Sequence, residues 1–400
     1  MNEKACLLMP LLLAAAANVG TTSAAAVSER FVPSDPGFVV ANVARSAPDD
    51  DLRRRVAAWQ ADPEGEAAAQ LATAFLERAR AQREPMLVGR AESVLARAAR
   101  GAGATHEHKR LYAETLQFRH DFSAAGQLLD GVLVENPRDS AARTQRASIR
   151  LVRGDFAGAR ADCARLMAGG DAAAPIGAAC FAEALAGGGD LERARALLRT
   201  WPVESADPAV RAYLLTVRAE LGERVAHPDS APTGSSDLDA AITDYASALK
   251  LQPMDDSIRV SLADALATLG DLERARATLR IERPSLALLA RQAIFAVGSE
   301  RTRAQAQAEA LLALETARGD TAHAREAAML ALANGDGPRA LQLARANFSS
   351  QRELSDVRLL ARAASAELAA ADLRVMRDWL ARTGFADAVT ETVLANAARR

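Results

Sequence analysis

Two eleven-residue stretches of this chain are almost identical: GDLERARALLR begins at Gly189, and GDLERARATLR begins at Gly270. In a helical protein such a Gly ends one helix, because it adopts the left-handed conformation without a steric cost. The Asp that follows caps the next helix by accepting hydrogen bonds from its first backbone N–H groups. The Ala four residues after that Asp, Ala194 or Ala275, is small where the two helices cross. The repeated stretch therefore predicts a tight joint between two packed helices.

The same joint recurs along the chain at a nearly constant interval. Its aspartates are Asp121, Asp155, Asp190, Asp237 and Asp271, spaced by 34, 35, 47 and 34 residues, and each is followed four residues later by Ala. A helix–turn–helix unit of 34 residues is the tetratricopeptide period. The composition favours an all-α fold, because Ala and Leu are strong helix formers, whereas aromatic residues make up only 4% of the chain.

The segments GDFAGA, GDLERA and DLDAAITDYASALKLQP resemble tetratricopeptide repeats, most clearly over residues 106–283 and by extension over 51–398. RGDTAHAREAA and DVRLLARAA, nearer the C-terminus, resemble uncharacterised exported tetratricopeptide proteins of Gram-negative bacteria. The resemblance implies a right-handed α-solenoid of about nine helix pairs, each with a helix A followed by a helix B. It also implies a concave groove lined by helices A, and it brings no known activity. Polar residues in the last helix, expected at 385–398, predict a C-terminal capping helix.

Residues 1–26 are predicted to be a secretory signal peptide. Lys4 supplies a positive charge, residues 5–17 are almost entirely apolar, and small residues precede a cleavage site after Ala26. The competing interpretation is the apolar start of a cytosolic protein. Residues 27–50 carry three prolines and no helical period, so they are predicted to be an extended lead-in. A cleaved signal would place the mature protein in the periplasm or outside the cell.

The 47-residue interval between two aspartates indicates an insertion. The polar segment 223–236, ERVAHPDSAPTGSS, separates a helix A expected at 208–221 from the helix B that begins near Asp237. Long loops without regular structure are either functional or disordered. The composition of this segment favours a flexible insertion.

Charge and motifs limit the functions that the chain can have. The net charge is −2, so there is no basic excess to neutralise phosphates, and no nucleic-acid partner is expected. The five histidines lack the spacing of metal ligands, and the glycines at 187–189 close a helix, so neither a metal nor a nucleotide cofactor is expected. No nucleophile motif is present, and no later stretch is apolar and long enough to span a bilayer. The chain is therefore predicted not to be an enzyme and not to stay inserted in a membrane.

Helices A carry the positions that face the groove of a tetratricopeptide solenoid. Aligning Asp121 with the capping position of the repeat places Arg110, Glu114 and Phe118 on the concave surface, and the same alignment places Glu183 there two repeats later. The predicted groove is largely apolar with scattered charges. It predicts a protein or peptide partner, whose identity the residues do not reveal.

Arg143, Arg146 and Arg150 share one face of the helix expected at 140–153. One interpretation is an arginine stripe that binds an acidic peptide or a carboxylate. The other is an internal ladder of ion pairs. The acids considered as internal partners are Glu114, Asp162 and Glu183.

Cys163 and Cys180 are the only cysteines after the predicted signal peptide. Cys163 is expected at a core-facing position of a helix B, and Cys180 in helix A of the next repeat, where adjacent helices touch. An oxidising compartment would favour a disulfide between them. In the alternative, both are unpaired small apolar side chains in helix interfaces.

Together these features predict a non-catalytic scaffold that docks a peptide or protein segment in its concave groove, in the bacterial cell envelope. The alternative is a purely structural or accessory subunit of an envelope enzyme or transport complex. A hydrolase site within 223–236 is disfavoured, because only His227, Asp229 and Ser230 stand there as candidate catalytic groups, in a polar segment.

Overall fold

The computed structural model describes residues 50–82, 84, 86–170, 173–226, 236–317 and 323–399. Within those ranges all regular secondary structure is helical. The predicted signal peptide (1–26) and all of the lead-in (27–50) except Asp50 lie outside the described residues. Residues 227–235 of the predicted insertion lie outside them as well.

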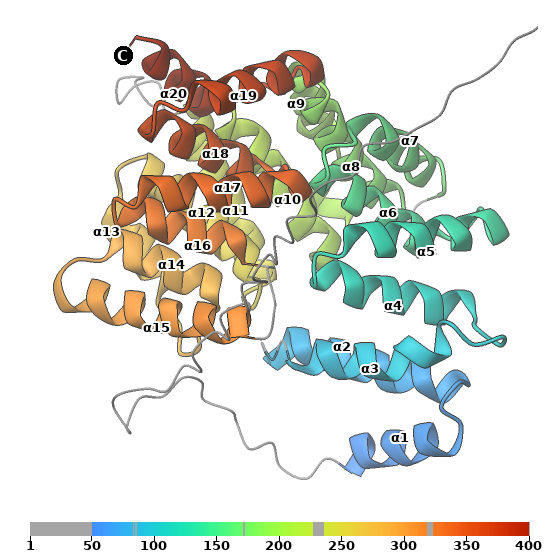
Figure 1. The fold of residues 1–400 in the computed structure, drawn as a ribbon. Helices are drawn as coiled ribbons and strands as arrows, with labels where there is room; N and C mark the ends of the chain where they lie inside the picture. The colour runs from blue at the N-terminus through green and yellow to red at the C-terminus, as the bar shows by residue number, and fades with distance from the viewer. Residues whose placement is uncertain are drawn as a thin grey trace, which may run out of the picture.

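Nine helix pairs follow one another in the described part of the chain, between α1 (Asp50–Ala61) and α20 (Ala388–Ala398) (Figure 1). The helices A are α2 (Glu66–Gln82), α4 (His106–Phe118), α6 (Ser140–Val152), α8 (Ala174–Gly187), α10 (Pro208–Glu223), α12 (Asp256–Thr268), α14 (Leu286–Phe295), α16 (Ala324–Ala333) and α18 (Leu354–Ala366). The helices B are α3 (Met86–Ala98), α5 (Phe122–Glu135), α7 (Phe156–Met167), α9 (Leu191–Thr200), α11 (Ser236–Leu251), α13 (Leu272–Leu279), α15 (Gly298–Ala317), α17 (Gly337–Ser350) and α19 (Ala370–Thr383). A short 3₁₀ helix, η1 (Val203–Ser205), precedes α10. The predicted all-α solenoid of helix pairs, with a capping helix at its C-terminal end, is confirmed.

The predicted joint of Gly and Asp forms several of the turns between helix A and helix B. The glycines Gly154, Gly189, Gly270 and Gly335 have φ values of 75°, 94°, 88° and 79°. At the second of the two near-identical stretches, the N–H of Asp271 donates to the carbonyl of Leu266 at 2.9 Å, which is one of the two bonds of a Schellman motif. The Asp271 carboxylate then caps α13 by accepting from the N–H of Arg274 at 3.0 Å. The first stretch differs, because Asp190 makes no capping bond with its side chain.

Two turns between helix A and helix B use a residue other than Gly at the left-handed position. His120 has a φ of 61° and Leu368 a φ of 48°. After Leu368 the turn closes in the usual way, because the N–H of Ala369 donates to the carbonyl of Ala364 at 2.9 Å. A side chain in this conformation costs about 1–2 kcal/mol. The packing of the repeat therefore imposes the turn even where the residue opposes it.

Small residues allow the helices of each pair to approach closely. The alanines four residues after the capping position are at most 2% exposed: Ala125, Ala159, Ala194, Ala241 and Ala275. Larger apolar side chains such as Leu129 and Tyr245 are buried around them. Most helices A also pack on the next helix A, and these helices form the inner face of the solenoid.

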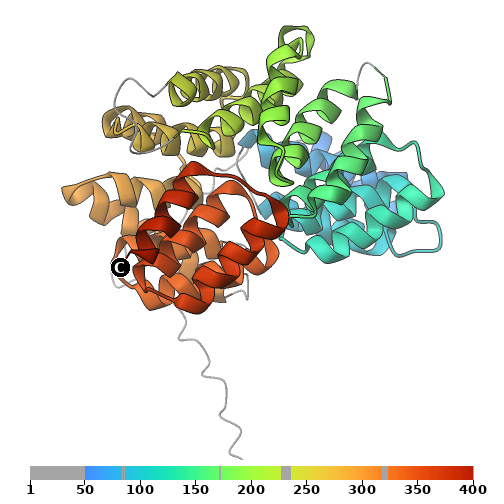
Figure 2. The ribbon, with the colours of Figure 1, turned by 90° about the horizontal axis from the view of Figure 1, so that it is seen from above.

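The solenoid closes on itself. In two perpendicular views, α17–α20 lie beside α6–α10, although the two groups are far apart in the sequence (Figure 1 and Figure 2). The contact joins one edge of the α4–α10 repeats to α18, α19 and the loops that flank them, and we call it the clasp. On one side its residues are His120, Val152–Phe156, Ala186–Gly189, Glu223 and Arg224. On the other side they are Gln351, Arg352, Arg358, Trp379 and Gly384–Ala388.

Main-chain hydrogen bonds fix the register of the clasp. The N–H of Arg352 donates to the carbonyl of Val152 at 2.7 Å, and the N–H of Ala388 donates to the carbonyl of Arg224 at 2.9 Å. The Arg224 guanidinium also crosses the contact, because it donates to the carbonyl of Ala386 at 2.9 Å. Because most of these partners are backbone atoms, the register depends little on which side chains surround them.

Aromatic side chains form the apolar centre of the clasp. Phe156 of α7 lies with its ring centroid 6.4 Å from Trp379 and 6.3 Å from Phe385. Trp379 and Phe385 are 5.2 Å apart, and the guanidinium of Arg224 lies 3.9 Å from the centroid of Phe385, in cation–π geometry. Aromatic rings from two distant parts of the chain therefore pack on one another at this point.

Glycine permits the closest backbone approach in the clasp. A Cβ added to Gly189 would lie 3.1 Å from the Cα of Gly384, and one added to Gly384 would lie 2.8 Å from the Cα of Gly189. A Cβ added to Gly270, in the other copy of the stretch, would meet nothing within 4 Å. The same sequence therefore serves as a joint at Gly270, and as both a joint and a clasp contact at Gly189.

The flexible insertion was predicted to begin at residue 223, but the structure still has ordered, buried residues there. α10 extends to Glu223 instead of ending at 221, and Glu223 and Arg224 are only 5% and 3% exposed. These two charged residues made the segment look like a polar loop, but both form buried interactions in the clasp. Gly222 does not end the helix either, since it lies inside α10, where an added Cβ would be 3.2 Å from the carbonyl oxygen of Asp237.

Candidate partner-binding surface

The first helices A present a polar inner face. Arg80 of α2 forms an ion pair with Glu114 of α4. The Gln117 amide of α4 donates to the hydroxyl of Ser148 on α6 at 3.4 Å. Both contacts join successive helices A, which is where the sequence placed the concave surface. Phe118, at the C-terminal end of α4, is 53% exposed, an unusual position for a large aromatic ring.

Arg110, Glu114 and Phe118 follow one another at four-residue spacing on α4, so they share one face of the helix. Arg110 is half-buried, and within the described ranges its side chain has no hydrogen bond or ion pair. We call these three residues the α4 row. In this row Arg110 has free hydrogen-bond donors, Glu114 is paired with Arg80, and Phe118 has an exposed ring. A guanidinium of this kind suits a carboxylate ligand, and an exposed ring suits an apolar anchor.

Further along the inner face, Glu183 of α8 is half-buried. Its carboxyl accepts a hydrogen bond from the Tyr213 hydroxyl of α10 at 2.5 Å. Burial raises the pKa of Glu183 to about 8, and the neighbouring Glu220 adds to the shift. Burial also raises the pKa of Glu220 to about 7, although the positive charge of Arg224 opposes it. Glu183, predicted as a groove residue, thus already has a hydrogen-bond partner within the protein.

A network of buried charges ties α10 to the C-terminal repeats. Arg358 of α18 donates to Glu223 and, at 2.7 Å and 3.1 Å, to Asp387. Glu223 also accepts from the Tyr245 hydroxyl at 3.2 Å. Burial alone would raise the pKa of Asp387, but Arg358 and the bonds from Thr390 hold this pKa below its usual value. Removing one partner would leave a buried charge without compensation. The network therefore stabilises the contact between α10 and the C-terminal repeats.

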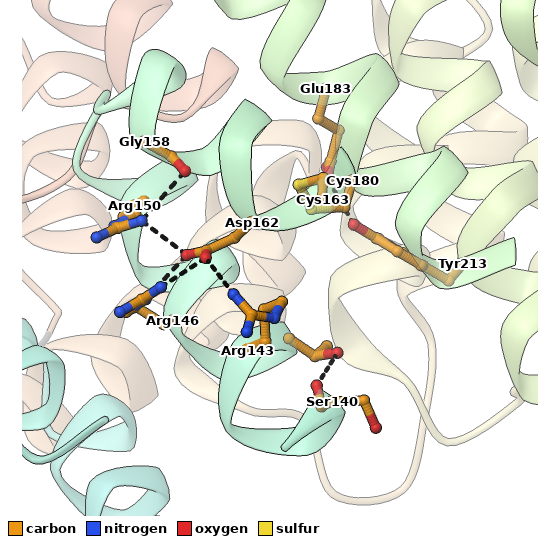
Figure 3. The surroundings of a disulfide bond; sticks show 11 residues. Ser140, Arg143, Arg146, Arg150, Gly158, Asp162, Cys163, Cys180, Glu183 and Tyr213 are labelled. Carbon is orange, nitrogen blue, oxygen red and sulfur yellow. Dashed lines mark hydrogen bonds and ion pairs between the residues drawn. A yellow bond between two sulfur atoms is a disulfide. The ribbon is translucent and has the colours of Figure 1, made fainter. Parts of the chain in front are cut away.

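Asp162 of α7 gathers the arginine stripe into one cluster (Figure 3). Its carboxylate, 1% exposed, accepts from Arg143 at 3.2 Å, from Arg146 at 2.6 Å and 2.9 Å, and from Arg150 at 2.7 Å. Arg146 also pairs with Asp130 at 2.7 Å. The stripe is therefore an internal ion-pair cluster between the two helices of one repeat. Of the three acids considered as partners, only Asp162 fills this role, because Glu114 pairs with Arg80 and Glu183 with Tyr213.

Cys163 and Cys180 are joined next to this cluster (Figure 3). Their Cα atoms are 5.6 Å apart, and the two residues are 0% and 4% exposed. Cys163 belongs to α7, a helix B, and Cys180 to α8, the next helix A. The bond therefore links two successive repeats across their interface.

Sequence reasoning missed the residues of the clasp. Arg358 interrupts an apolar run of α18, between Val357 and Leu359, and a charge in such a run is a signal of a buried ion pair. Its partners Glu223 and Asp387 lie 135 and 29 residues away. Nothing local in the sequence indicates which acids they are.

His108, in the segment THEHKR at residues 105–110, has a structural role. His108 is 1% exposed, and with Thr105 it forms a capping box at the start of α4. Across the described residues, no three His, Cys, Asp or Glu side chains converge to form a group that could hold a metal ion. None of the helices searched, which are those of the described ranges, is both long and apolar enough to cross a bilayer.

The joints, the helix pairs and the inner row of helices A define the fold as a tetratricopeptide-like α-solenoid. Three solved structures to which the chain is similar are tetratricopeptide repeat proteins. The one from Parabacteroides merdae is 14% identical over 74% of this chain and 99% of its own, with a TM-score of 0.38. A thermophilic protein from Thermus thermophilus is 18% identical over 66% and 100%, with a TM-score of 0.26, and the P58(IPK) domain is 15% identical over 82% and 99%, with a TM-score of 0.24. No protein-family model matches the chain, and no curated protein matches it.

Proposed function

We propose that the chain is an interaction scaffold that binds an extended peptide or protein segment along the inner face of α2, α4 and α6. The observation that carries the proposal is the row Arg110, Glu114 and Phe118 on one face of α4. Further along the inner face, the Glu183 carboxyl already accepts a hydrogen bond from Tyr213. Binding is therefore assigned to the N-terminal half of the solenoid.

The row fits a ligand that has a carboxylate beside an apolar side chain. Arg110 supplies free donors for the carboxylate, while Phe118 supplies an exposed ring for the apolar group. Glu114 is held by Arg80, so its charge is compensated within the protein and does not repel an acidic ligand. Because these groups stand on packed helices, the surface is preorganised, which lowers the entropic cost of docking.

Docking of this kind involves no covalent chemistry, and we propose a non-catalytic role. We further propose that the chain works in the bacterial cell envelope after removal of residues 1–26. The disulfide between Cys163 and Cys180 supports an oxidising compartment. The second candidate function is that of a structural or accessory subunit of an envelope enzyme or transport complex. A surface that binds a protein segment can also hold such a subunit in its complex.

A site-specific photo-crosslinker tests the binding surface. Benzoylphenylalanine is placed at position 118 in one strain and, as a control, at position 134 in another, because Val134 at the end of α5 is 81% exposed and lies off the inner face. The proposal predicts a discrete crosslinked partner from position 118 and none from position 134. Arg110→Glu should weaken the crosslink without changing the melting temperature. Equal crosslinking from both positions, or no effect of Arg110→Glu, would contradict the proposal.

The compartment is tested separately. Cell fractionation should recover the chain in the periplasm or the medium, lacking its first 26 residues, and thiol labelling after unfolding should find Cys163 and Cys180 unreactive. Recovery of the full-length chain in the cytosol with two reactive thiols would exclude the envelope location. It would not bear on the binding surface, which the crosslinking experiment tests independently.

A further inference from the structure

His120 brings a titratable ring into the clasp. It lies in the turn between α4 and α5, where its φ of 61° is in the left-handed region that is unfavourable for most side chains. The half-buried imidazole stacks on the ring of Phe122, with the two centroids 5.4 Å apart. Its Nδ1 atom lies 3.1 Å from Nε2 of Gln351, the residue that follows α17. A strained residue thus holds a titratable group at a contact between distant repeats.

The orientation of the Gln351 amide is fixed by its other partners. Its Oε1 atom accepts from the Arg325 guanidinium at 3.4 Å, and its Nε2 atom donates to Oδ1 of Asn347 at 3.2 Å. Asn347 is oriented in turn, because its Nδ2 atom donates to the Asp356 carboxylate at 2.6 Å. A guanidinium can only donate and a carboxylate can only accept, so the two ends of this chain set the direction of each bond. Turning the Gln351 amide over would place its NH₂ group against Arg325.

The fixed amide determines which protonation state of His120 fits the clasp. Because Gln351 presents an N–H donor, Nδ1 of His120 must accept, and only the neutral imidazole has an acceptor nitrogen. A protonated ring carries an N–H on both nitrogens, so its Nδ1–H would face the Gln351 donor. Protonation therefore replaces a hydrogen bond with two opposed donors. Gln351 is only 6% exposed, so the contact has little access to water that could separate them.

The groups around His120 also disfavour a positive charge on its ring. Burial lowers the pKa of His120 below its ordinary value of 6.5, and the neighbouring His323 and Arg325, at the start of α16, add to the shift. Glu326 of α16 and Glu353, the residue before α18, act in the opposite direction but do not outweigh the burial. Hydrogen-bond geometry and electrostatics therefore both favour the neutral ring in the clasp.

We propose that His120 is a pH-sensitive latch of the clasp, which holds when the ring is neutral and weakens when the ring is protonated in mildly acidic conditions. With the clasp open, the ring has its ordinary pKa of about 6.5. With the clasp closed, the pKa is lower, so the contribution of His120 is fully present above pH 6.5 and is lost as the pH falls below it. Arg352, next to Gln351, makes the main-chain bond to Val152, so the loss acts on the register of the clasp. The latch does not depend on what the α4 row binds.

Hydrogen exchange of the Arg352 amide at pH 5 and pH 7 tests the latch. At each pH, the exchange rate of an unprotected amide is divided by the observed rate to give a protection factor, which removes the intrinsic effect of pH. Acid should lower the protection factor of Arg352 several-fold. The upper limit is about 25-fold, which is the most that one group with a pKa of about 6.5 in the open form can supply between these two pH values.

His120→Asn isolates the contribution of the ring. Asparagine does not titrate, and it tolerates the left-handed conformation. The acids Glu183 and Glu220 stay in this variant, so any pH dependence that they cause is retained. The ratio of protection at pH 7 to protection at pH 5 should therefore be several-fold larger in the original chain than in His120→Asn. His106→Asn is the control, because His106 of α4 contacts Glu135 at 2.8 Å, outside the clasp, and this variant should keep the ratio of the original chain.

Three outcomes would overturn the proposal. Equal ratios in the original chain and in His120→Asn would show that another group causes the pH dependence. The same loss of pH dependence in His106→Asn would show that the effect is not specific to the clasp. An NMR titration of the His120 ring in the original chain, which serves even if His120→Asn does not fold, should give a pKa below 6.5. A pKa at or above 6.5 would mean that the clasp does not favour the neutral ring.

Discussion

The two near-identical stretches allow a matched test of the clasp. Gly189→Ala and Gly270→Ala place the same methyl group in the same sequence context, at φ values of 94° and 88°. Both variants pay the same conformational cost of about 1–2 kcal/mol for a side chain in the left-handed region. At Gly270 nothing else lies within 4 Å of the new carbon, whereas at Gly189 the Cα of Gly384 lies at 3.1 Å.

The difference in free energy of unfolding between the two variants measures the close contact of Gly189 with Gly384 in the clasp. A contact of 3.1 Å with a backbone atom cannot be relieved by turning a side chain, so the two loops must separate slightly. Overpacking of this kind costs about 1–3 kcal/mol. Gly189→Ala should therefore lower the free energy of unfolding by about 2–5 kcal/mol in total, and Gly270→Ala by about 1–2 kcal/mol.

Urea denaturation followed by circular dichroism compares the two proteins, with Gly335→Ala as a second control. Gly335 has a φ of 79° and, like Gly270, nothing within 4 Å of an added Cβ. Gly384→Ala should behave like Gly189→Ala, because its added carbon would lie 2.8 Å from the Cα of Gly189. If all four variants lose the same stability, Gly189 and Gly384 do not touch in solution, and the reasoning fails.

Three further predictions concern Asp162, Glu183 and the disulfide. Asp162→Asn should destabilise the chain by about 3–5 kcal/mol, because it leaves a buried arginine cluster short of negative charge; the exposed Asp130→Asn should cost less than about 1 kcal/mol, and similar urea midpoints for the two would refute the cluster. The Glu183 pKa of about 8 exceeds its unfolded value of 4.5, so the native state favours the protonated form and loses stability as pH rises between these values. The stability of Glu183→Gln relative to the original chain should therefore increase between about pH 5 and pH 8, by on the order of 3–4 kcal/mol. A constant difference in stability across this range would contradict the prediction. Reduction of the bond between Cys163 and Cys180, which are 17 residues apart, should lower the stability by about 3 kcal/mol, and an unchanged urea midpoint in reductant would count against it.

The repeat architecture is readable from the sequence because its determinants are local. A Gly, the next Asp and an Ala four residues later specify a turn, a cap and a crossing within six residues, and Gly270, Asp271 and Ala275 fulfil all three roles. The pairing of Arg143, Arg146 and Arg150 with an acid was also foreseeable as one of two alternatives, since a charge stripe on a packed helix needs compensation.

The clasp could not be predicted in this way. Its contacts join residues such as Arg352 and Val152, or Arg358 and Glu223, that lie several repeats apart in the sequence. Whether they meet depends on small rotations between successive repeats that add up along the solenoid. The sequence therefore predicted a concave groove lined by helices A, with Glu183 among its residues, but not the contact between the C-terminal repeats and the α4–α10 repeats.

Hydrogen exchange at two amides tests the closed solenoid most directly. The N–H of Arg352 lies in the loop between α17 and α18 and has its acceptor on Val152, while the N–H of Ala388 is the first of α20 and has its acceptor on Arg224. A first N–H has no acceptor within its own helix, so both amides depend on the clasp for protection. The adjacent N–H of Gln351 donates locally, to Asn347 at 2.9 Å, and is the internal control.

A closed clasp predicts that the amides of Arg352 and Ala388 exchange at least about 100-fold more slowly than unprotected amides, as Gln351 does. Protection of Gln351 together with free exchange at Arg352 and Ala388 would mean that the solenoid is open in solution. That result would contradict the central claim that the C-terminal repeats pack against the α4–α10 repeats.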